Sequence, residues 1–254
     1  QRRVDCLIER VLKLATHGEL ESEARVIGIV GYLLRPLSIY EYSPRPQVAA
    51  DYESMQKRVM PIFDIEGARI ALATRIRAAE ALGRSGDPRL SLGNFILLPG
   101  TRGALGRYPV TVAEFARFLD DDEGYMLTAV WDTAGWRWRS ELGREGPWNW
   151  DEQKSFPNRP VTGVSWWEAR AYCRWLGQRL VCEARLPLVS EWEKAATPQQ
   201  GGFPWGTTEP NDSLANFRNA VGAPTPIGLY PAGAGPYGHL DLSGNVDEWC
   251  DDGP

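Results

Sequence analysis

Histidine and cysteine are scarce in this sequence, and tryptophan is missing from its first part. The chain has two histidines, His17 and His239, so a metal site with three histidines from one chain is excluded. Its four cysteines, Cys6, Cys173, Cys182 and Cys250, show no Cys-x-x-Cys spacing. We interpret them as reduced thiols of a cytoplasmic protein. A disulfide between Cys173 and Cys182, or between Cys182 and Cys250, is the alternative.

Long apolar runs and dense basic patches are also missing. The longest apolar run, residues 26–34, has about half the length of a membrane span and lies between two arginines, so it predicts no transmembrane helix. The first residues contain neither the apolar core nor the small-residue cleavage site of a secretion signal. The net charge is −5 and the basic residues are scattered. Because phosphate binding needs a dense positive face, we expect no nucleic-acid partner.

Composition divides the chain into two parts. All eleven tryptophans lie between Trp131 and Trp249, whereas residues 1–95 contain none and are rich in Ala, Leu, Arg and Glu. We therefore predict a helical segment over residues 1–93 and a second domain over residues 94–254. The boundary should fall near residues 93–99, and either part can bury a core of its own.

The first part has the apolar periodicity of α-helices. Pro36 should end the second helix, and Gly83 should end the last one. The predicted helices cover residues 4–15, 26–36, 52–59 (within a long loop over residues 38–62) and 72–83.

Residues 78–90 resemble the end of a HEAT repeat. Such repeats stack paired helices, and one or two of them cannot bury their apolar faces alone. The resemblance implies that the first part is the tail of a longer solenoid, or a helical cap on the second domain. An unrelated helical hairpin is the alternative.

The second part contains three sequences typical of a capping box. In this motif a hydroxyl group and a glutamate three residues later satisfy free backbone amides at a helix start. We therefore expect helices near residues 111–119, 165–177 and 190–196. The three pairs are Thr111 with Glu114, Ser165 with Glu168, and Ser190 with Glu193.

Six sequence blocks in this second part follow the order found in the formylglycine-generating-enzyme (sulfatase-modifying-factor) domain family, which the chain resembles over residues 104–250. The blocks are Tyr-Pro-Val-Thr-Val-Ala-Glu-Phe from Tyr108, Pro-Val-Thr-Gly-Val-Ser-Trp-Trp-Glu-Ala from Pro160, Arg-Leu-Pro…Glu-Trp-Glu-Lys-Ala-Ala from Arg185, Pro-Trp-Gly from Pro204, Ala-Asn-Phe from Ala215 and Gly-Asn-Val-Asp-Glu-Trp from Gly244. The resemblance implies an α+β domain with the C-type-lectin-like fold, built around a small, twisted, mostly antiparallel sheet.

The chain departs from the family pattern where the family has its chemistry. Asp247 stands where the family usually has Trp, and the Arg-Gly-Gly-Ser block and the copper-binding cysteine pair of formylglycine-generating enzymes are missing. A longer polypeptide could carry either these elements or a hypervariable segment after Pro254. The related ergothioneine-pathway sulfoxide synthases use iron held by histidines of a helical domain, but His17 stands alone here. We therefore expect no copper or iron site in this chain.

The resemblance also implies calcium in the loops of the second part. It assigns the side chains of Asp241 and Glu248 and the carbonyls of Gly244 and Val246 to one site. A second site would use Asn216 with the carbonyl of Phe217. Calcium prefers six to eight hard oxygen ligands, which a tight Gly-Asn turn can supply. The alternative is that Asp241 caps a turn and that Glu248 is a solvated or paired acid.

Two further features have structural as well as functional interpretations. Cys173 lies in the middle of a predicted helix and is interpreted as a core thiol, and the acidic neighbours of Cys250 disfavour a reactive thiolate. Residues 132–158 are interpreted as a long tryptophan-rich loop. Its aromatic side chains fill the core or form a ligand surface.

These observations favour a non-catalytic module that recognises a protein or a small ligand on a C-type-lectin-like scaffold. It would be the sensor part of a larger protein or a variable protein diversified by a retroelement, with other domains of a longer polypeptide as partners. The alternatives are a copper-dependent formylglycine-generating oxidase, whose catalytic cysteines lie beyond the chain, and a purely structural domain. Fold analogy alone does not choose among them.

Overall fold

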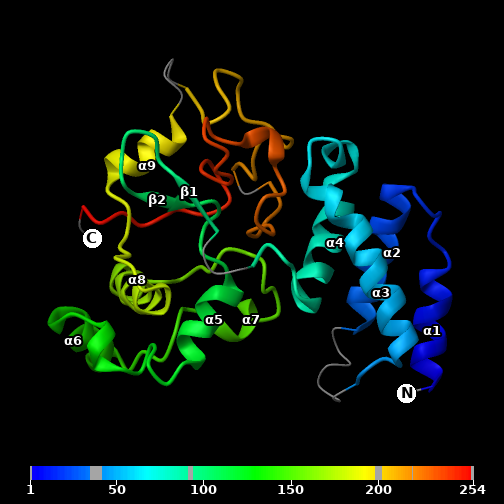
Figure 1. Ribbon diagram of the computed structural model, residues 1–254, viewed down its shortest axis with the longest axis horizontal. Helices are drawn as coiled ribbons and strands as arrows, with labels where there is room; N and C mark the ends of the chain where they lie inside the picture. Colours follow the sequence, from blue (N-terminus) through cyan, green and yellow to red (C-terminus); the bar gives the residue numbers. More distant parts are fainter. Residues whose placement is uncertain (1, 35–41, 91–93, 198–201, 219, 253–254) are drawn as a thin grey trace. The chain divides into compact units, whose positions relative to one another are not determined.

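The computed structural model describes residues 2–34, 42–90, 94–197, 202–218 and 220–252 (Figure 1). The chain divides into two compact units. The first unit contains Gln1–Pro88 together with Gly228–Ala232, and the second contains Arg89–Ile227 and Gly233–Pro254. The boundary that we expect after residue 93 adjoins residues 91–93, which lie outside the described part. Short helices and a small antiparallel sheet make the described chain a mixed α+β protein.

The first unit is helical. Pro46 opens α3, where its missing N–H costs nothing, so this helix covers more of the expected loop than predicted. The last helix continues through Gly83 and ends at Ser85, and its C-cap residue Gly86 has a left-handed φ of 101°. The expected stop at Pro36 lies outside the described residues. The elements are α1 (Arg2–Leu12), α2 (Leu20–Leu34), α3 (Pro46–Val59), η2 (Met60–Phe63), η3 (Gly67–Arg69) and α4 (Leu72–Ser85).

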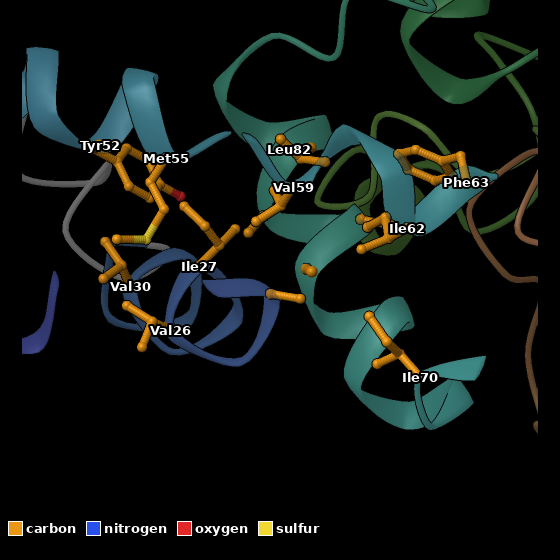
Figure 2. Packing of buried hydrophobic residues seen from close by; sticks show 14 of the residues in the cluster. Val26, Ile27, Val30, Tyr52, Met55, Val59, Ile62, Phe63, Ile70 and Leu82 are labelled. Atoms are coloured by element: carbon orange, nitrogen blue, oxygen red, sulfur yellow. The ribbon is translucent and has the colours of Figure 1, made fainter. Parts of the chain in front are cut away.

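One apolar core fills the first unit. Its side chains come from all four α-helices and from η2, and Figure 2 shows Ile27, Met55 and Leu82 among them. Gly28 and Gly31 let α2 and α4 approach closely, since a Cβ added to Gly28 would lie 2.9 Å from the Cβ of Arg77. Burial of this shared core, rather than local propensity, holds the short helices together.

A short segment from late in the sequence completes this core. Leu229 and Tyr230 belong to the same apolar cluster and are 0% and 2% exposed. Arg75 of α4 is also buried, and its Nη1 donates to the carbonyl oxygen of Leu229 at 2.5 Å, while its Nε donates to that of Ile70. The helical unit therefore depends on residues about 150 positions further along the chain.

The second unit combines five α-helices with one two-stranded sheet among the described residues. Phe95 pairs with Gly106 and Leu97 with Ala104 in an antiparallel register. The expected sheet is thus reduced to one hairpin, and isolated bridges such as that between Thr111 and Pro160 join the loops. The elements are β1 (Phe95–Leu97), β2 (Ala104–Gly106), α5 (Val112–Asp120), η4 (Thr128–Val130), α6 (Thr133–Leu142), α7 (Trp150–Gln153), α8 (Trp166–Leu180) and α9 (Val189–Ala196). The short η5 (Pro231–Gly233) begins in the first unit and ends in the second.

Two of the three expected capping boxes are confirmed, those at Thr111 for α5 and at Ser165 for α8. The third prediction was wrong, because Ser190 lies inside α9 and Leu188 is the N-cap residue. The Glu191 carboxylate accepts the Leu188 N–H, and Asp252 accepts the Val189 N–H at 2.8 Å. A distant carboxylate therefore satisfies an amide at the helix start, where a local hydroxyl was expected.

An aromatic cluster forms the core of the second unit. Phe115 and Tyr172 stack with ring centroids 5.5 Å apart, and Phe118 contacts Trp175 at the same distance. The expected loop over residues 132–158 was wrong, because it contains α6 and α7. Asp132 caps α6 by accepting the N–H of Gly135. Trp136 and Trp138 of α6 pack against the cluster, so these tryptophans serve the core.

Glu168 connects this core to its surroundings. Its carboxylate is fully buried and accepts the backbone N–H of Ser165 and the hydroxyl of Tyr125, both at 2.7 Å. Arg144 forms an ion pair with it at 3.3 Å. One buried carboxylate therefore joins the start of α8 to the loops on either side of α6. In the described chain, no helix has the length and the apolar character needed to cross a membrane.

Candidate functional site

The turn that carries the predicted calcium ligands has an unusual backbone. Asp241, Gly244 and Asn245 all lie in the left-handed region, with φ of 61°, 82° and 66°. Non-glycine residues adopt this conformation at a cost, which the surrounding structure has to offset. Asp241 is 6% exposed, so its carboxylate is held inside the turn. Such a tight turn can direct several oxygen atoms towards one point.

Asn245 and Asn216 connect this turn to the second predicted ligand set. The N–H of Asn245 donates to the Asn216 carbonyl oxygen at 3.0 Å, and the side-chain Nδ2 of Asn216 donates to Asn245 Oδ1 at 3.3 Å. The Asn245 Oδ1 also accepts the N–H of Thr225 at 2.8 Å. The structure therefore brings Asn216 next to the turn of residues 241–248, although the two are far apart in the sequence.

Phe217, the remaining residue of the second predicted set, lies beside this network. The guanidinium of Arg218 lies 5.1 Å from the centre of the Phe217 ring. The amide oxygen of Asn216 accepts the N–H of Val221 at 3.4 Å. The side chain of Asn216 therefore stabilises its own loop, besides any role as a ligand.

Glu248 interacts electrostatically with Asp241. Although Glu248 is exposed as a residue, the protein atoms around its carboxyl group, and then the charge of Asp241, raise its pKa to about 7. The indole N–H of Trp192 donates to Glu248 Oε1 at 3.3 Å and acts in the opposite direction. The charge of Asp241 therefore disfavours the ionised form of Glu248.

Contacts with α8 and α9 hold the segment that carries Glu248. The N–H of Asp251 donates to the carbonyl oxygen of Pro187 at 2.8 Å, just before α9. Trp166 of α8 donates its indole N–H to the Cys250 carbonyl oxygen, and Trp249 donates to that of Val164, both at 2.9 Å. The sequence indicated these tryptophans only as members of the ordered blocks, and their role as donors that position Glu248 was missed.

An ion pair fixes the entry to α9, which carries Trp192. Arg185 donates from Nη1 and Nη2 to the two carboxylate oxygens of Glu191 at 2.7 and 2.8 Å. This pair, and then the N–H of Leu188, lower the pKa of Glu191 from 4.5 to about 2. The contribution to stability is therefore fully present above pH 4.5 and is lost as the pH falls towards 2.

We expect Glu191→Gln to destabilise the second unit at neutral pH and to lose this effect in acid. Urea unfolding followed by tryptophan fluorescence should show a gap between variant and parent that narrows from pH 4.5 towards pH 2, because glutamine has no ionisation to lose. Glu145→Gln changes an exposed carboxylate and should show no such narrowing. A gap of constant size for Glu191→Gln would contradict the assignment.

The thiols and imidazoles of this chain do not fit a redox-metal site. Burial raises the pKa of Cys173 to about 12, and burial with neighbouring acids raises that of Cys250, so neither favours the thiolate that copper needs. All four cysteines are free thiols, which excludes the alternative disulfides in this structure. Within the described ranges, no group of three His, Cys, Asp or Glu side chains is arranged to hold a metal ion.

Comparison with known proteins matches most of the second unit to one domain family. Residues 103–253 match the family described as "Sulfatase-modifying factor enzyme 1-like domain". The hercynine oxygenase of Mycolicibacterium thermoresistibile is 40% identical over 160 residues, which cover 57% of this chain and 34% of that protein. The hercynine oxygenase of Mycobacterium tuberculosis is 38% identical over 161 residues, covering 57% of this chain and 36% of that protein.

A second kind of enzyme in the family is also similar. The formylglycine-generating enzyme of Mycobacterium tuberculosis is 36% identical over 202 residues, which cover 58% of this chain and 62% of that protein. The chain spans about a third of the length of the hercynine oxygenases that it matches. The similarity is therefore confined to part of those enzymes.

These relatives correct the functional hypothesis drawn from the sequence. The expected non-catalytic recognition module, including the retroelement-diversified version, was wrong, because three similar proteins are hercynine oxygenases. The oxidase alternative agrees better with the comparison. Since the family matches more than half of the sequence, the chain belongs to the sulfatase-modifying factor enzyme 1-like domain family.

Proposed function

We propose that this protein is an oxygenase or oxidase and that the present chain supplies its family domain. The observation that carries the proposal is the similarity of 38–41% to three hercynine oxygenases, each over about 160 residues. The family match includes the Gly-Asn turn and the tryptophans that position it. Both candidate activities, the oxygenase and the formylglycine-generating oxidase, consume molecular oxygen.

The described side chains support a binding and positioning role within that reaction. His17 is an exposed residue of the first unit, whereas His239 is fully buried in the second. Neither these histidines nor the cysteines fit an iron or copper site. We propose instead that the redox metal is held by groups other than those of the described residues, in agreement with the partial coverage of the relatives.

The finer structural expectations belong to the same proposal. We propose a C-type-lectin-like arrangement for residues 94–254, supported by the family match and by the small antiparallel sheet. We also propose that the first unit is a HEAT-like segment that joins other domains of a longer polypeptide. Its paired helices support this proposal. The free thiols favour a reducing, cytoplasmic setting.

Oxygen consumption tests the proposed activity directly. The native polypeptide, expressed from its own gene and loaded with iron(II) or copper(I), is given hercynine with a small thiol, or a cysteine-containing sulfatase peptide. We expect oxygen uptake with one of the two substrates and loss of uptake after chelator treatment. Background uptake with both substrates and both metals would contradict the proposal.

We further propose that calcium binds at the turn of the second unit. Asp241 and Glu248 would supply carboxylates, and Gly244 and Val246 would supply carbonyl oxygens. The support for this site is the electrostatic interaction of the two acids and the left-handed turn that contains Gly244 and Asn245. For the second set, Asn216 and Phe217, the support is only that Asn216 adjoins the same turn. No nucleic-acid or membrane partner is part of this proposal.

Thermal melting tests the calcium site. A ligand that binds only the folded state stabilises it by about 2.7 kcal/mol at a hundredfold excess over its dissociation constant. Chelator should therefore lower the melting temperature of the protein, and Glu248→Gln should remove most of the calcium response. Asp247→Asn, an exposed neighbour outside the ligand set, should keep it. If neither calcium nor chelator changes the melting temperature, hydrogen bonds alone hold the turn.

A further inference from the structure

The first unit has a cavity of about 320 Å³ beside the contact between α2 and α4. This volume lies at the lower end of the range for small-molecule sites, roughly 300–1,000 Å³. None of its residues belongs to the Gly-Asn turn or to the family domain. Its walls are Arg25, Ile29 and Tyr32 from α2 and Thr74, Arg77 and Arg84 from α4.

The arginines give this groove a positive character. Arg77 is exposed on α4, whereas Arg25 is paired with Glu21 on its own helix at 3.0 Å. Arg84 is half-buried at the far end of the lining set and lies near Tyr52. Guanidinium groups bind carboxylate and phosphate with two parallel hydrogen bonds, which makes them better suited to an anion than to a neutral ligand.

An acidic group on α2 cancels the charge of Arg25, which pairs with Glu21. Glu23 is buried and bonded to Arg58 at 2.7 Å. Glu80 of α4 is not among the residues that line the groove. The lining set therefore contains no acid, although Arg25 is paired with an acid of its own helix.

The other wall of the groove is apolar and unusually exposed. Tyr32 is 73% exposed and Ile29 is 42% exposed, one turn apart on α2. The Thr74 hydroxyl adds a neutral hydrogen-bonding group on the opposite helix. An aromatic ring can stack on Tyr32 while its acidic group reaches the arginines, so each wall has a matching part of one molecule.

We propose that this groove binds a small organic anion that carries an aromatic ring and a phosphate or carboxylate group. The ring lies against Tyr32 and Ile29, and the exposed guanidinium of Arg77 binds the anion. This site adds a ligand to the protein that is independent of the oxygenase proposal. The volume, the lining arginines and the exposed aromatic wall all agree on the same ligand chemistry.

Titration calorimetry with phenyl phosphate, inorganic phosphate and phenol tests the site. We expect saturable binding of phenyl phosphate to one site, weaker binding of phosphate, and none of phenol. Arg77→Gln should weaken the binding of phenyl phosphate by about tenfold or more, because a charge-assisted bidentate contact is lost. Glutamine keeps the Cβ that packs on Gly28, so the helix contact is retained.

Two further variants separate the contributions. Tyr32→Ala should reduce the affinity for phenyl phosphate to that for inorganic phosphate. Arg10→Gln removes an exposed positive charge from α1 and should leave binding unchanged. Absence of binding, equal binding by the Arg77 variant and the parent, or phenol binding as well as phenyl phosphate would overturn the proposal. So would self-association of the protein that Arg77→Gln and Tyr32→Ala abolish, because the groove would then belong to a second copy.

Discussion

Replacing Glu168 by alanine should lower the free energy of unfolding of the second unit by about 3–5 kcal/mol, the usual cost of removing one partner from a buried ion pair. The carboxylate is fully buried and accepts hydrogen bonds from Tyr125 and Ser165, besides its pairing with Arg144. Its loss leaves a phenol hydroxyl and a largely buried guanidinium without their acceptor, and α8 loses half of its capping box.

Urea unfolding followed by tryptophan fluorescence measures this effect, because all eleven tryptophans lie in the second unit. Glu123→Ala is the matched control. Its carboxylate pairs with Arg179 at 2.9 Å but is 69% exposed, and an exposed pair contributes about 0–1 kcal/mol. If the two variants unfold at the same urea concentration, the buried network does not have the importance assigned to it.

Leu229→Ala should destabilise the helical first unit by about 2–5 kcal/mol, although the residue lies far outside residues 1–88 in the sequence. Leu229 is fully buried in the cluster that holds α2, α3 and α4. Truncation leaves a cavity among these helices, while the carbonyl oxygen that accepts from Arg75 is kept. The loss is therefore one of packing alone.

Hydrogen exchange followed by mass spectrometry locates the effect. Peptides from α2 and α4 should exchange faster in Leu229→Ala than in the parent protein. Leu14→Ala is the same chemical change at a position of this unit that is 71% exposed, and its effect should stay within about 0.5 kcal/mol. Unchanged protection of α2 and α4 in Leu229→Ala would show that the segment is not part of the helical core.

Local signals in the sequence identified the elements whose ends are set by near neighbours. The capping boxes at Thr111 and Ser165 satisfy backbone amides within one turn, so the starts of α5 and α8 could be predicted. The start of α9 could not be predicted, because Asp252 and the pairing of Glu191 with Arg185 replace the expected local cap. The helix α6 was missed since its tryptophans were interpreted as loop residues.

The candidate site shows the same division. The residue types and the order of the blocks pointed to Asp241, Glu248 and Asn216 through the family resemblance. Their meeting depends on a left-handed turn and on hydrogen bonds such as that from Asn245 to Asn216. Trp192 reaches Glu248 from a helix more than fifty residues earlier, and no periodic pattern encodes such a distance.

The sequence by itself determined the two-part composition, the family and most of the helices, because hydrophobic period, capping residues and motif order are local properties of a chain. Only the tertiary structure decided that Leu229 completes the helical core, that Glu168 is a buried junction and that arginines of α2 and α4 share one groove. These features depend on packing between residues distant in sequence. Hydrogen bonds and charges buried by that packing interact more strongly than they do in water.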